Sequence, residues 1–251
     1  MSSWPLHRAS LLNVDELNTQ LAGTPAQAAQ AIIAAARSGA TQAQALLGQI
    51  LLDGRGIEQD PLLARRWFAI AAQRGHLMAR NLLGRCHEHG WGGKADLGLA
   101  AVHYRQCAEA GLDWGMYNLA NLLATGRGVR QHVQGAIAWY KRAAELGHAK
   151  SMNLYGRYLE EGIAIPQNLP AAHAWYQRAA EAGDFRGQFS HGSVLFAAGR
   201  AEEGLAWLEK ARVNGHEGFR EAMAQALSAA PSAQLRALAS QWRSGHGKAV
   251  A

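Results

Sequence analysis

Apolar and polar positions follow a helical spacing through the middle of the chain, and the whole pattern recurs every 36 residues. A small residue marks the same point of each repeat, at Gly48, Gly84, Ala120, Gly156 and Gly192. A second series keeps the same step and consists of Gly39, Gly75, Gly111, Gly147 and Gly183, with Gly215 following after an interval four residues shorter. A period of this length is typical of a solenoid, in which each unit is one supersecondary hairpin that buries its apolar face only against its neighbours.

Each repeat contains two predicted helices separated by a glycine-bearing loop. The first helices are expected at 42–53, 78–89, 114–125, 150–161 and 187–197, and the second helices at 60–73, 96–109, 132–145, 168–181 and 201–213. The first helices are followed by glycines, which end helices with a positive φ, at Gly54, Gly90, Gly126 and Gly162. The second helices begin near residues with N-cap chemistry, at Asp60, Asp96 and Asn168. Because four residues are missing between Ala198 and Gly204, the fifth hairpin is expected to have a tight turn.

The second helix of each repeat carries a small residue, an aromatic residue four positions later and another small residue three positions after that. The sets are Ala64, Phe68 and Ala71; Ala100, Tyr104 and Cys107; Ala136, Tyr140 and Ala143; and Ala172, Tyr176 and Ala179. This spacing places the three side chains on one helix face. We expect the ring to fill the space between helices that the small residues allow to approach.

The repeat boundaries predict one elongated, all-α domain with three parts. Residues 1–40 form an N-terminal segment with a capping helix at 25–37 and a short turn at Asp15 to Leu21, residues 41–215 form five hairpins, and residues 216–251 contain closing helices at 217–229 and 231–243 and a tail. Terminal helices of this kind are expected where a repeat array must present a polar end to water.

The net charge is +6, from 25 basic and 19 acidic residues, and most of the basic residues are arginines. Arginine suits carboxylates, so a protein or peptide partner of mildly acidic character matches this composition. The basic residues are scattered with no run of five or more, which argues against nucleic-acid binding. The first 13 residues lack the apolar segment of a signal peptide, and no stretch has about 18 uninterrupted apolar residues. We therefore expect a cytoplasmic protein without membrane association.

Two segments show the repeat most fully, ALLGQILLDGRGIEQDPLLARRWFAIAAQRGH at 45–76 and NLANLLATGRGVRQHVQGAIAWYKRAAELGH at 118–148. They resemble Sel1-like repeats, which are related to the tetratricopeptide repeat. The resemblance covers roughly Thr41 to Gly215. It implies a right-handed α-solenoid that acts as an adaptor or scaffold for protein partners, with no shared catalytic residue and no cofactor.

In such hairpins the first helix lines the concave surface, and its outward positions lie three and seven residues apart. Reading these positions in the second to fifth repeats predicts a partner-binding groove formed by Asn81, Arg85, Trp114, Tyr117, Asn121, Lys150, Asn153, Arg157, Arg186 and Phe189. Asparagine amides can bond to an extended peptide, the cationic groups can bind carboxylates, and the aromatic rings provide apolar anchors. The alternative is that these side chains pack against the next repeat.

The second repeat departs from the pattern by gathering four soft or borderline metal ligands, Cys86, His87, His103 and Cys107. Since His103 and Cys107 lie one helical turn apart, a zinc-type or redox-responsive site is one hypothesis. The commoner interpretation is that the cysteines are small core residues. No CxxC or HExxH spacing is present, so we predict no bound metal.

No arrangement of residues indicates catalysis. The Gly-Arg-Gly loops at 54–56 and 126–128 recur with the repeat and lack a following Lys-Ser/Thr, so they indicate turn geometry and not a phosphate site. No Ser–His–Asp set or paired carboxylates stand out, which leaves a hydrolase of unrecognised type as a remote alternative. The sequence favours a non-enzymatic binding protein whose partner and oligomeric state it does not identify.

Overall fold

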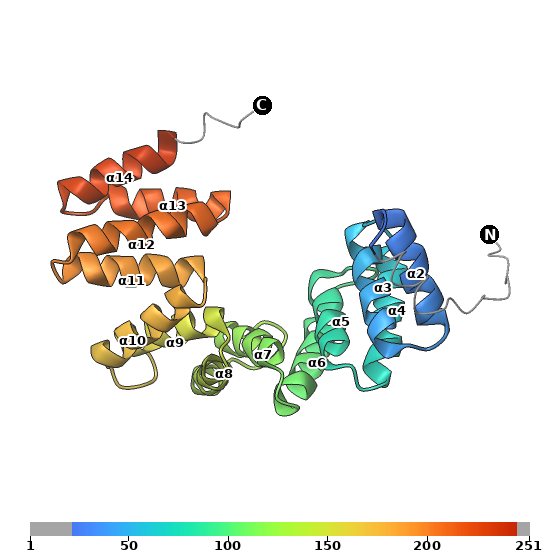
Figure 1. Ribbon diagram of the computed structural model, residues 1–251. Helices are drawn as coiled ribbons and strands as arrows, with labels where there is room; N and C mark the ends of the chain where they lie inside the picture. Colours follow the sequence, from blue (N-terminus) through green and yellow to red (C-terminus); the bar gives the residue numbers. More distant parts are fainter. Residues whose placement is uncertain (1–21, 245–251) are drawn as a thin grey trace. The chain divides into compact units, whose positions relative to one another are not determined.

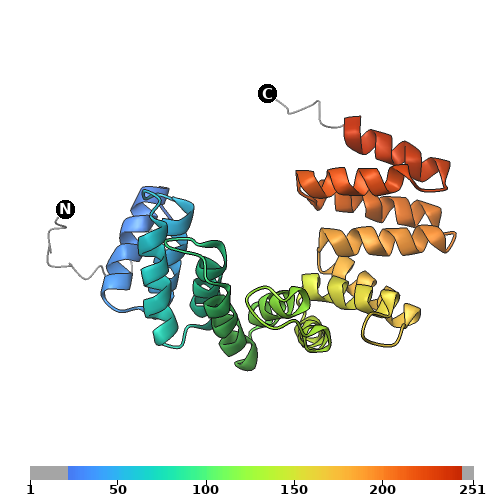
Figure 2. The same cartoon turned by 180° about the vertical axis from the view of Figure 1, so that it is seen from behind.

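The computed structural model describes residues 22–244, which form 13 α-helices and no strands (Figure 1; Figure 2 shows the reverse view). The first helices of the five hairpins are α3 (Thr41–Asp53), α5 (Leu77–His89), α7 (Asp113–Thr125), α9 (Ala149–Glu161) and α11 (Phe185–Ala197). The second helices are α4 (Pro61–Gln73), α6 (Leu97–Glu109), α8 (Val133–Glu145), α10 (Leu169–Glu181) and α12 (Ala201–Asn214). The remaining helices are α2 (Pro25–Arg37), α13 (Glu217–Ser228) and α14 (Ala233–Ser244). The predicted turn at Asp15 to Leu21 lies outside the described residues.

The helix boundaries agree with the sequence signals that predicted them. The residues after α3, α5, α7 and α9 are Gly54, Gly90, Gly126 and Gly162, with φ of 72°, 73°, 72° and 66°. This left-handed backbone is the conformation that glycine adopts most readily.

At the start of the second helices, the carboxylate of Asp60 accepts a hydrogen bond from the Leu63 amide (2.9 Å) and that of Asp96 from the Leu99 amide (2.8 Å). The Asn168 side chain does the same for Ala171 at 3.0 Å. The fifth hairpin has the expected tight turn, because α11 ends at Ala197 and α12 begins at Ala201.

The small–aromatic–small stripe of the second helices is buried as predicted. Phe68 and Tyr104 are both fully buried, and each ring lies against the glycine of the preceding first helix. A Cβ atom at Gly48 would lie 2.6 Å from the Phe68 ring, and one at Gly84 would lie 2.7 Å from the Tyr104 ring. The absence of a side chain at these glycines therefore allows the ring to reach the helix backbone.

The N-cap residue of the first helix is a histidine in two of the five hairpins. His76 Nδ1 accepts a hydrogen bond from the Ala79 amide at 3.0 Å, and His148 Nδ1 accepts from the Ser151 amide at 3.3 Å. Asp184 has the same role at the start of α11, where it accepts from the Gly187 amide at 2.9 Å. Ala40 and Leu112, at the corresponding starts of α3 and α7, make no side-chain cap.

The helices group into two compact units, Met1–Trp139 and Tyr140–Ala251, with the boundary inside α8. In the first unit each helix from α2 to α7 packs against the next. In the second unit α9, α10, α11 and α12 pack in sequence, and residues of α12, α13 and α14 share a cluster that includes Leu208 and Trp242. Figure 1 shows α11 to α14 as successive layers of that unit. The divisions expected near residues 40 and 215 remain predictions.

Candidate partner-binding surfaces

An aromatic pair with one exposed ring marks the first helix of the third hairpin. Trp114 is 37% exposed at the start of α7, and its ring meets the half-buried ring of Tyr117 edge to face, with 6.2 Å between the ring centroids. Asn121 is half-buried on the same helix. Aromatic rings of this kind are frequent anchors in protein interfaces, because they bury much apolar area with few rotatable bonds.

In the neighbouring hairpin, a second aromatic ring carries an arginine stacked on its face. The guanidinium of Arg85 on α5 lies 5.0 Å from the centroid of the Trp91 ring, in the loop after α5. Trp91 also packs on His89, with ring centroids 4.7 Å apart. Because Arg85 is exposed, its guanidinium is available to a carboxylate while it stacks on the indole.

Two of the three asparagines predicted for the groove, Asn81 and Asn153, instead lie between hairpins. Asn81 is 2% exposed, and its Oδ1 accepts a hydrogen bond from Asn118 Nδ2 at 2.9 Å. In the second unit Asn153 is 8% exposed, and its Oδ1 accepts from Ser190 Oγ at 3.0 Å. Each bond joins the first helices of successive hairpins, which is the packing alternative. These amides are therefore structural links, and the exposed neighbours are the better candidates for binding.

The second unit presents basic groups on its first helices. Arg157 is exposed on α9, and its Nε lies 3.8 Å from Glu161. Arg186 is exposed on α11, with its guanidinium 4.5 Å from the centroid of the Phe185 ring. Lys150 is half-buried at the start of α9. Burial raises the pKa of the Asp184 carboxyl, while its hydrogen bond to the Gly187 amide and the charges of Arg186 and Lys150 act in the opposite direction.

Phe189 lies between the hairpin array and its closing helices. Its ring meets Phe219 at 6.1 Å and Trp242 at 6.3 Å, both edge to face, so much of it packs inside the second unit. The rest of its side chain lines a cavity of about 570 Å³ together with Ser193 of α11 and His173 of α10. This volume is in the range of sites that hold a side chain or a small molecule.

Two pairs of a buried tyrosine and a half-buried glutamate were not anticipated. The Tyr104 hydroxyl donates to Glu88 Oε2 at 2.7 Å, and the Tyr176 hydroxyl donates to Glu160 Oε2 at 2.6 Å. Glu88 also lies 3.5 Å from the guanidinium of Arg127. Burial, followed by the glutamate bond, raises the pKa of both phenols. The signal was present in the sequence, because both members of the second pair lie two periods after those of the first.

The four potential metal ligands of the second repeat do not form a ligand set. Among residues 22–244, no group of three or more His, Cys, Asp or Glu side chains is placed to hold a metal ion. Cys86 and Cys107 are fully buried, and burial raises the pKa of each thiol to about 11. Cys107 Sγ donates to the Leu77 carbonyl oxygen at 3.4 Å. These contacts agree with the interpretation of both cysteines as core residues.

The two histidines of that repeat stack on each other. The rings of His87 and His103 are 5.3 Å apart and nearly parallel, and Arg65 Nη2 lies 3.3 Å from His87 Nδ1. Burial lowers the pKa of His103 to about 4, with further lowering by the nearby charges of His87, Arg80 and Arg65. Burial also lowers the pKa of His87. Both shifts favour the neutral form of the rings.

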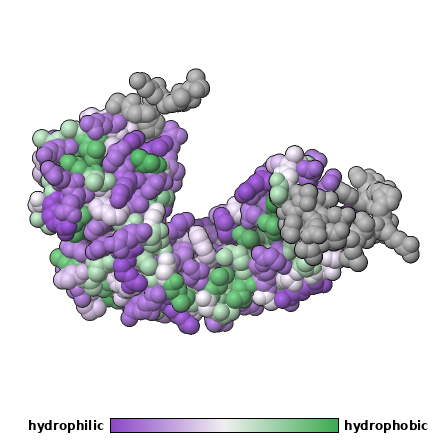
Figure 3. Space-filling view, in the orientation of Figure 1, coloured by the Kyte–Doolittle hydropathy of each residue, from purple (hydrophilic) through white to green (hydrophobic). Residues whose placement is uncertain are grey.

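The face of the molecule seen in Figure 3 mixes hydrophilic and hydrophobic residues, without a continuous apolar band. In the described part of the chain, none of the helices is both long and apolar enough to cross a membrane.

Comparison with known proteins shows the same repeat. The Sel1 repeat matches residues 41–76, 77–112, 115–148 and 149–184, which are the first four hairpins. The crystal structure of a Sel1 repeat protein from Oxalobacter formigenes is 27% identical, with a TM-score of 0.78 over 95% of this chain and 100% of that one. No curated protein matches this chain in sequence.

Two further structures have the same fold. One is c5321, a protective antigen present in uropathogenic Escherichia coli strains, which is 25% identical with a TM-score of 0.68. The match covers 89% of this chain but only 50% of that protein. The other is the immunity protein PA5088 of Pseudomonas aeruginosa, which is 17% identical with a TM-score of 0.55 over 82% of this chain and 80% of that one. At this identity the likeness concerns the fold alone. The all-α solenoid fold expected from the sequence is confirmed.

Proposed function

This chain belongs to the Sel1 repeat family, and we propose that it is a non-catalytic adaptor that binds a protein or peptide through the first helices of its hairpins. The observation that carries the proposal is the exposed Trp114, held edge to face against Tyr117 on α7. A folded protein gains little by exposing part of a tryptophan, whereas a binding surface uses such a ring as an anchor.

The charges of the first helices indicate the kind of partner. Arg85 in the first unit, and Arg157 and Arg186 in the second, are exposed cations on these helices. An acidic or carboxylate-bearing segment would complement them, and such charges contribute most to the rate of association and to specificity. We propose that each unit supplies its own contact surface, one centred on Trp114 and Tyr117 and the other on Arg157 and Arg186.

The proposal excludes Asn81 and Asn153 from direct contact, because their side-chain oxygens already bind the neighbouring hairpin. It places Phe189 at the edge of the second surface, where the ring lines the cavity of about 570 Å³. No cluster of His, Cys, Asp or Glu side chains in residues 22–244 supports the metal-responsive alternative. The cytoplasmic location expected from the sequence remains a prediction.

The test uses the full chain as bait in a lysate of its native cell, followed by affinity measurements with the purified partner. Tyr117→Ala perturbs the first surface and Arg157→Ala the second. Arg105→Ala and Gln177→Ala are matched controls, because both side chains are exposed on second helices. If the replaced side chain contacts the partner, the substitution should weaken binding by about tenfold or more, which corresponds to about 1.4 kcal/mol.

Circular dichroism must show unchanged helicity in all four variants. A partner that binds both surface variants as tightly as the wild type would contradict the placement of the binding surfaces. Loss of binding in the Arg105→Ala or Gln177→Ala controls would indicate that the partner contacts the second helices.

A further inference from the structure

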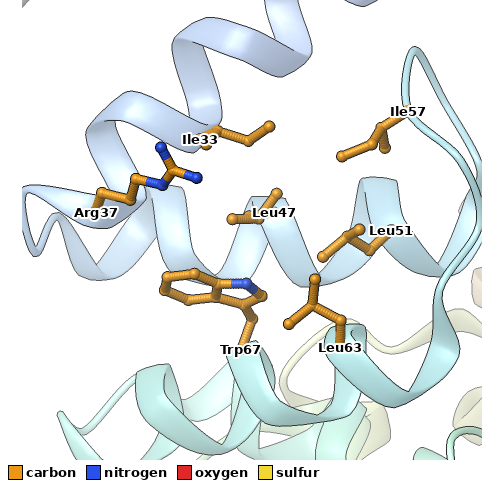
Figure 4. Close-up of a pocket in the computed structure, with 7 residues that line it drawn as sticks. All are labelled: Ile33, Arg37, Leu47, Leu51, Ile57, Leu63 and Trp67. Atoms are coloured by element: carbon orange, nitrogen blue, oxygen red, sulfur yellow. The ribbon is translucent and has the colours of Figure 1, made fainter. Parts of the chain in front are cut away.

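An apolar pocket of about 220 Å³ lies between α2, α3 and α4 in the first unit, and none of its lining residues belongs to the surfaces proposed above (Figure 4). Leu47 and Leu51 of α3 line its inner part, since each is only 2% exposed. Ile33 of α2 and Trp67 of α4 are half-buried at its sides. Figure 4 shows the guanidinium of Arg37 beside Ile33, and Arg37 is the one charged residue among the described residues that line the pocket.

The two residues of α2 that line the pocket, Ile33 and Arg37, differ in chemical type from the residues at the equivalent positions of the later second helices. The residues one, two, three and four periods after Ile33 are Ala69, Arg105, Lys141 and Gln177, and those after Arg37 are Gln73, Glu109, Glu145 and Glu181. Later in the array these two positions bond to each other. Lys141 Nζ lies 3.9 Å from Glu145, and Gln177 Nε2 donates to Glu181 at 2.9 Å. In α2 the first position is apolar and the second is a cation.

Among residues 22–244, Arg37 consequently has no counter-charge on its own helix. Helix α2 contains no Asp or Glu. Within residues 22–244, none of the ion pairs involves the Arg37 guanidinium. A cation that borders an apolar pocket is complementary to a molecule with an anionic group and an apolar body.

The size of the pocket limits the apolar body. Since an apolar cavity of about 150 Å³ binds benzene, a pocket of this volume can hold roughly eight or nine carbon atoms. We propose that it binds a small amphiphilic carboxylate of the medium-chain fatty-acid type. The chain lies against Leu47, Leu51 and Trp67, and the carboxylate takes a bidentate hydrogen bond from Arg37. The partial exposure of Ile33 and Trp67 provides the way in.

Three probes with the same chain and different head groups test the proposal on the full protein: octanoate, octanol and octylammonium. Calorimetry should show octanoate binding about fivefold tighter than octanol, as expected for a partly exposed ion pair, and octylammonium binding most weakly. Arg37→Gln should reduce the affinity for octanoate to that for octanol, and Arg37→Glu should reverse the order of the two charged probes. Arg105→Gln is the matched control, since Arg105 is exposed on α6 outside the pocket, and it should change none of the affinities.

A second variant provides an independent readout. Trp67→Phe should keep the affinity for octanoate within about threefold, because a smaller ring still covers the chain, while removing the tryptophan fluorescence change on binding. Equal affinities for the three probes, no saturable binding of octanoate, or an unchanged affinity in Arg37→Gln would overturn the proposal. A dimer of the wild type that Arg37→Glu abolishes in sedimentation would also overturn it, by assigning the pocket to a second copy of the chain.

Discussion

Gly84 of α5 lies directly against the ring of Tyr104 on α6, so that a Cβ atom on the glycine would be 2.7 Å from Tyr104 Cε1. Such a distance is too short for two carbon atoms, and the ring is held in place by its full burial and its bond to Glu88. The close approach of the two helices in this hairpin therefore depends on the absence of one methyl group.

Gly84→Ala should lower the free energy of unfolding by about 1–3 kcal/mol, because the helices must separate to admit the methyl group. Urea denaturation measures the effect. Gly98→Ala is the matched control, since a Cβ at Gly98 meets nothing closer than 3.4 Å and alanine is the better helix former. Equal stability of Gly84→Ala and the wild type would show that the ring moves at no cost.

Tyr104→Phe should destabilise the first unit by about 1–3 kcal/mol, because it removes a partly buried hydrogen bond to a carboxylate. Phenylalanine fits the space, as Phe68 shows at the equivalent position of the first hairpin. The measurement is a double-mutant cycle in urea with Glu88→Gln. If the two single changes simply add, the hydroxyl and the carboxylate are not coupled.

Lowering the pH should reduce the stability of the first unit, because His87 and His103 become protonated. Both folded-state pKa values are lowered from the ordinary 6.5, that of His103 to about 4, so the folded form favours neutral rings. The resulting stability is fully present above about pH 6.5 and is lost as the pH falls toward 4. Thermal melts of the wild type should therefore drop between pH 7 and pH 5 by more than those of His103→Gln. Parallel pH profiles for the two proteins would refute this assignment.

His148→Ala should cost about 1 kcal/mol, because the α9 amide of Ser151 loses its cap, whereas His148→Asn should keep most of the stability. Introducing a cap where the structure has none should raise the free energy of unfolding. Leu112→Asn should add about 1 kcal/mol at the uncapped start of α7. Urea denaturation of the three variants at neutral pH tests both directions. A loss in His148→Asn as large as that in His148→Ala would mean that the ring acts through packing.

The thiols of Cys86 and Cys107 should react slowly with Ellman's reagent in the folded protein and rapidly in denaturant. Both side chains are fully buried, and their raised pKa of about 11 leaves little thiolate at pH 8. Single Cys→Ala variants assign each rate. Fast reaction of either thiol in the folded protein would reopen the redox hypothesis.

The helix ends were predictable because their causes are local. A left-handed residue such as Gly54 or a cap such as Asp60 acts within a few residues, and the 36-residue period repeats the signal. The glycine and aromatic series were equally visible, and their burial follows from their fixed spacing. The sequence therefore predicted the hairpins with their boundaries correct to within about two residues.

The binding surface was harder to predict, because it depends on how each hairpin is rotated against the next. Asn81 and Tyr117 occupy equivalent positions one period apart, yet the first is buried in a bond with Asn118 and the second is partly exposed. Periodicity treats these positions as the same. The pocket beside Arg37 was not predicted for a related reason, since the repeat pattern identifies α2 only as a capping helix and does not show which of its side chains border a cavity.

The glycine–ring contact also bears on how such arrays change in length during evolution. Gly48 and Phe68, Gly84 and Tyr104, and Gly156 and Tyr176 each come from a single 36-residue period. A duplication or deletion of one whole period therefore adds or removes both halves of the contact together and leaves no ring without its glycine. Gene rearrangements in steps of one hairpin can thus lengthen or shorten the protein without creating a mismatched helix pair, wherever the period is cut outside the contact.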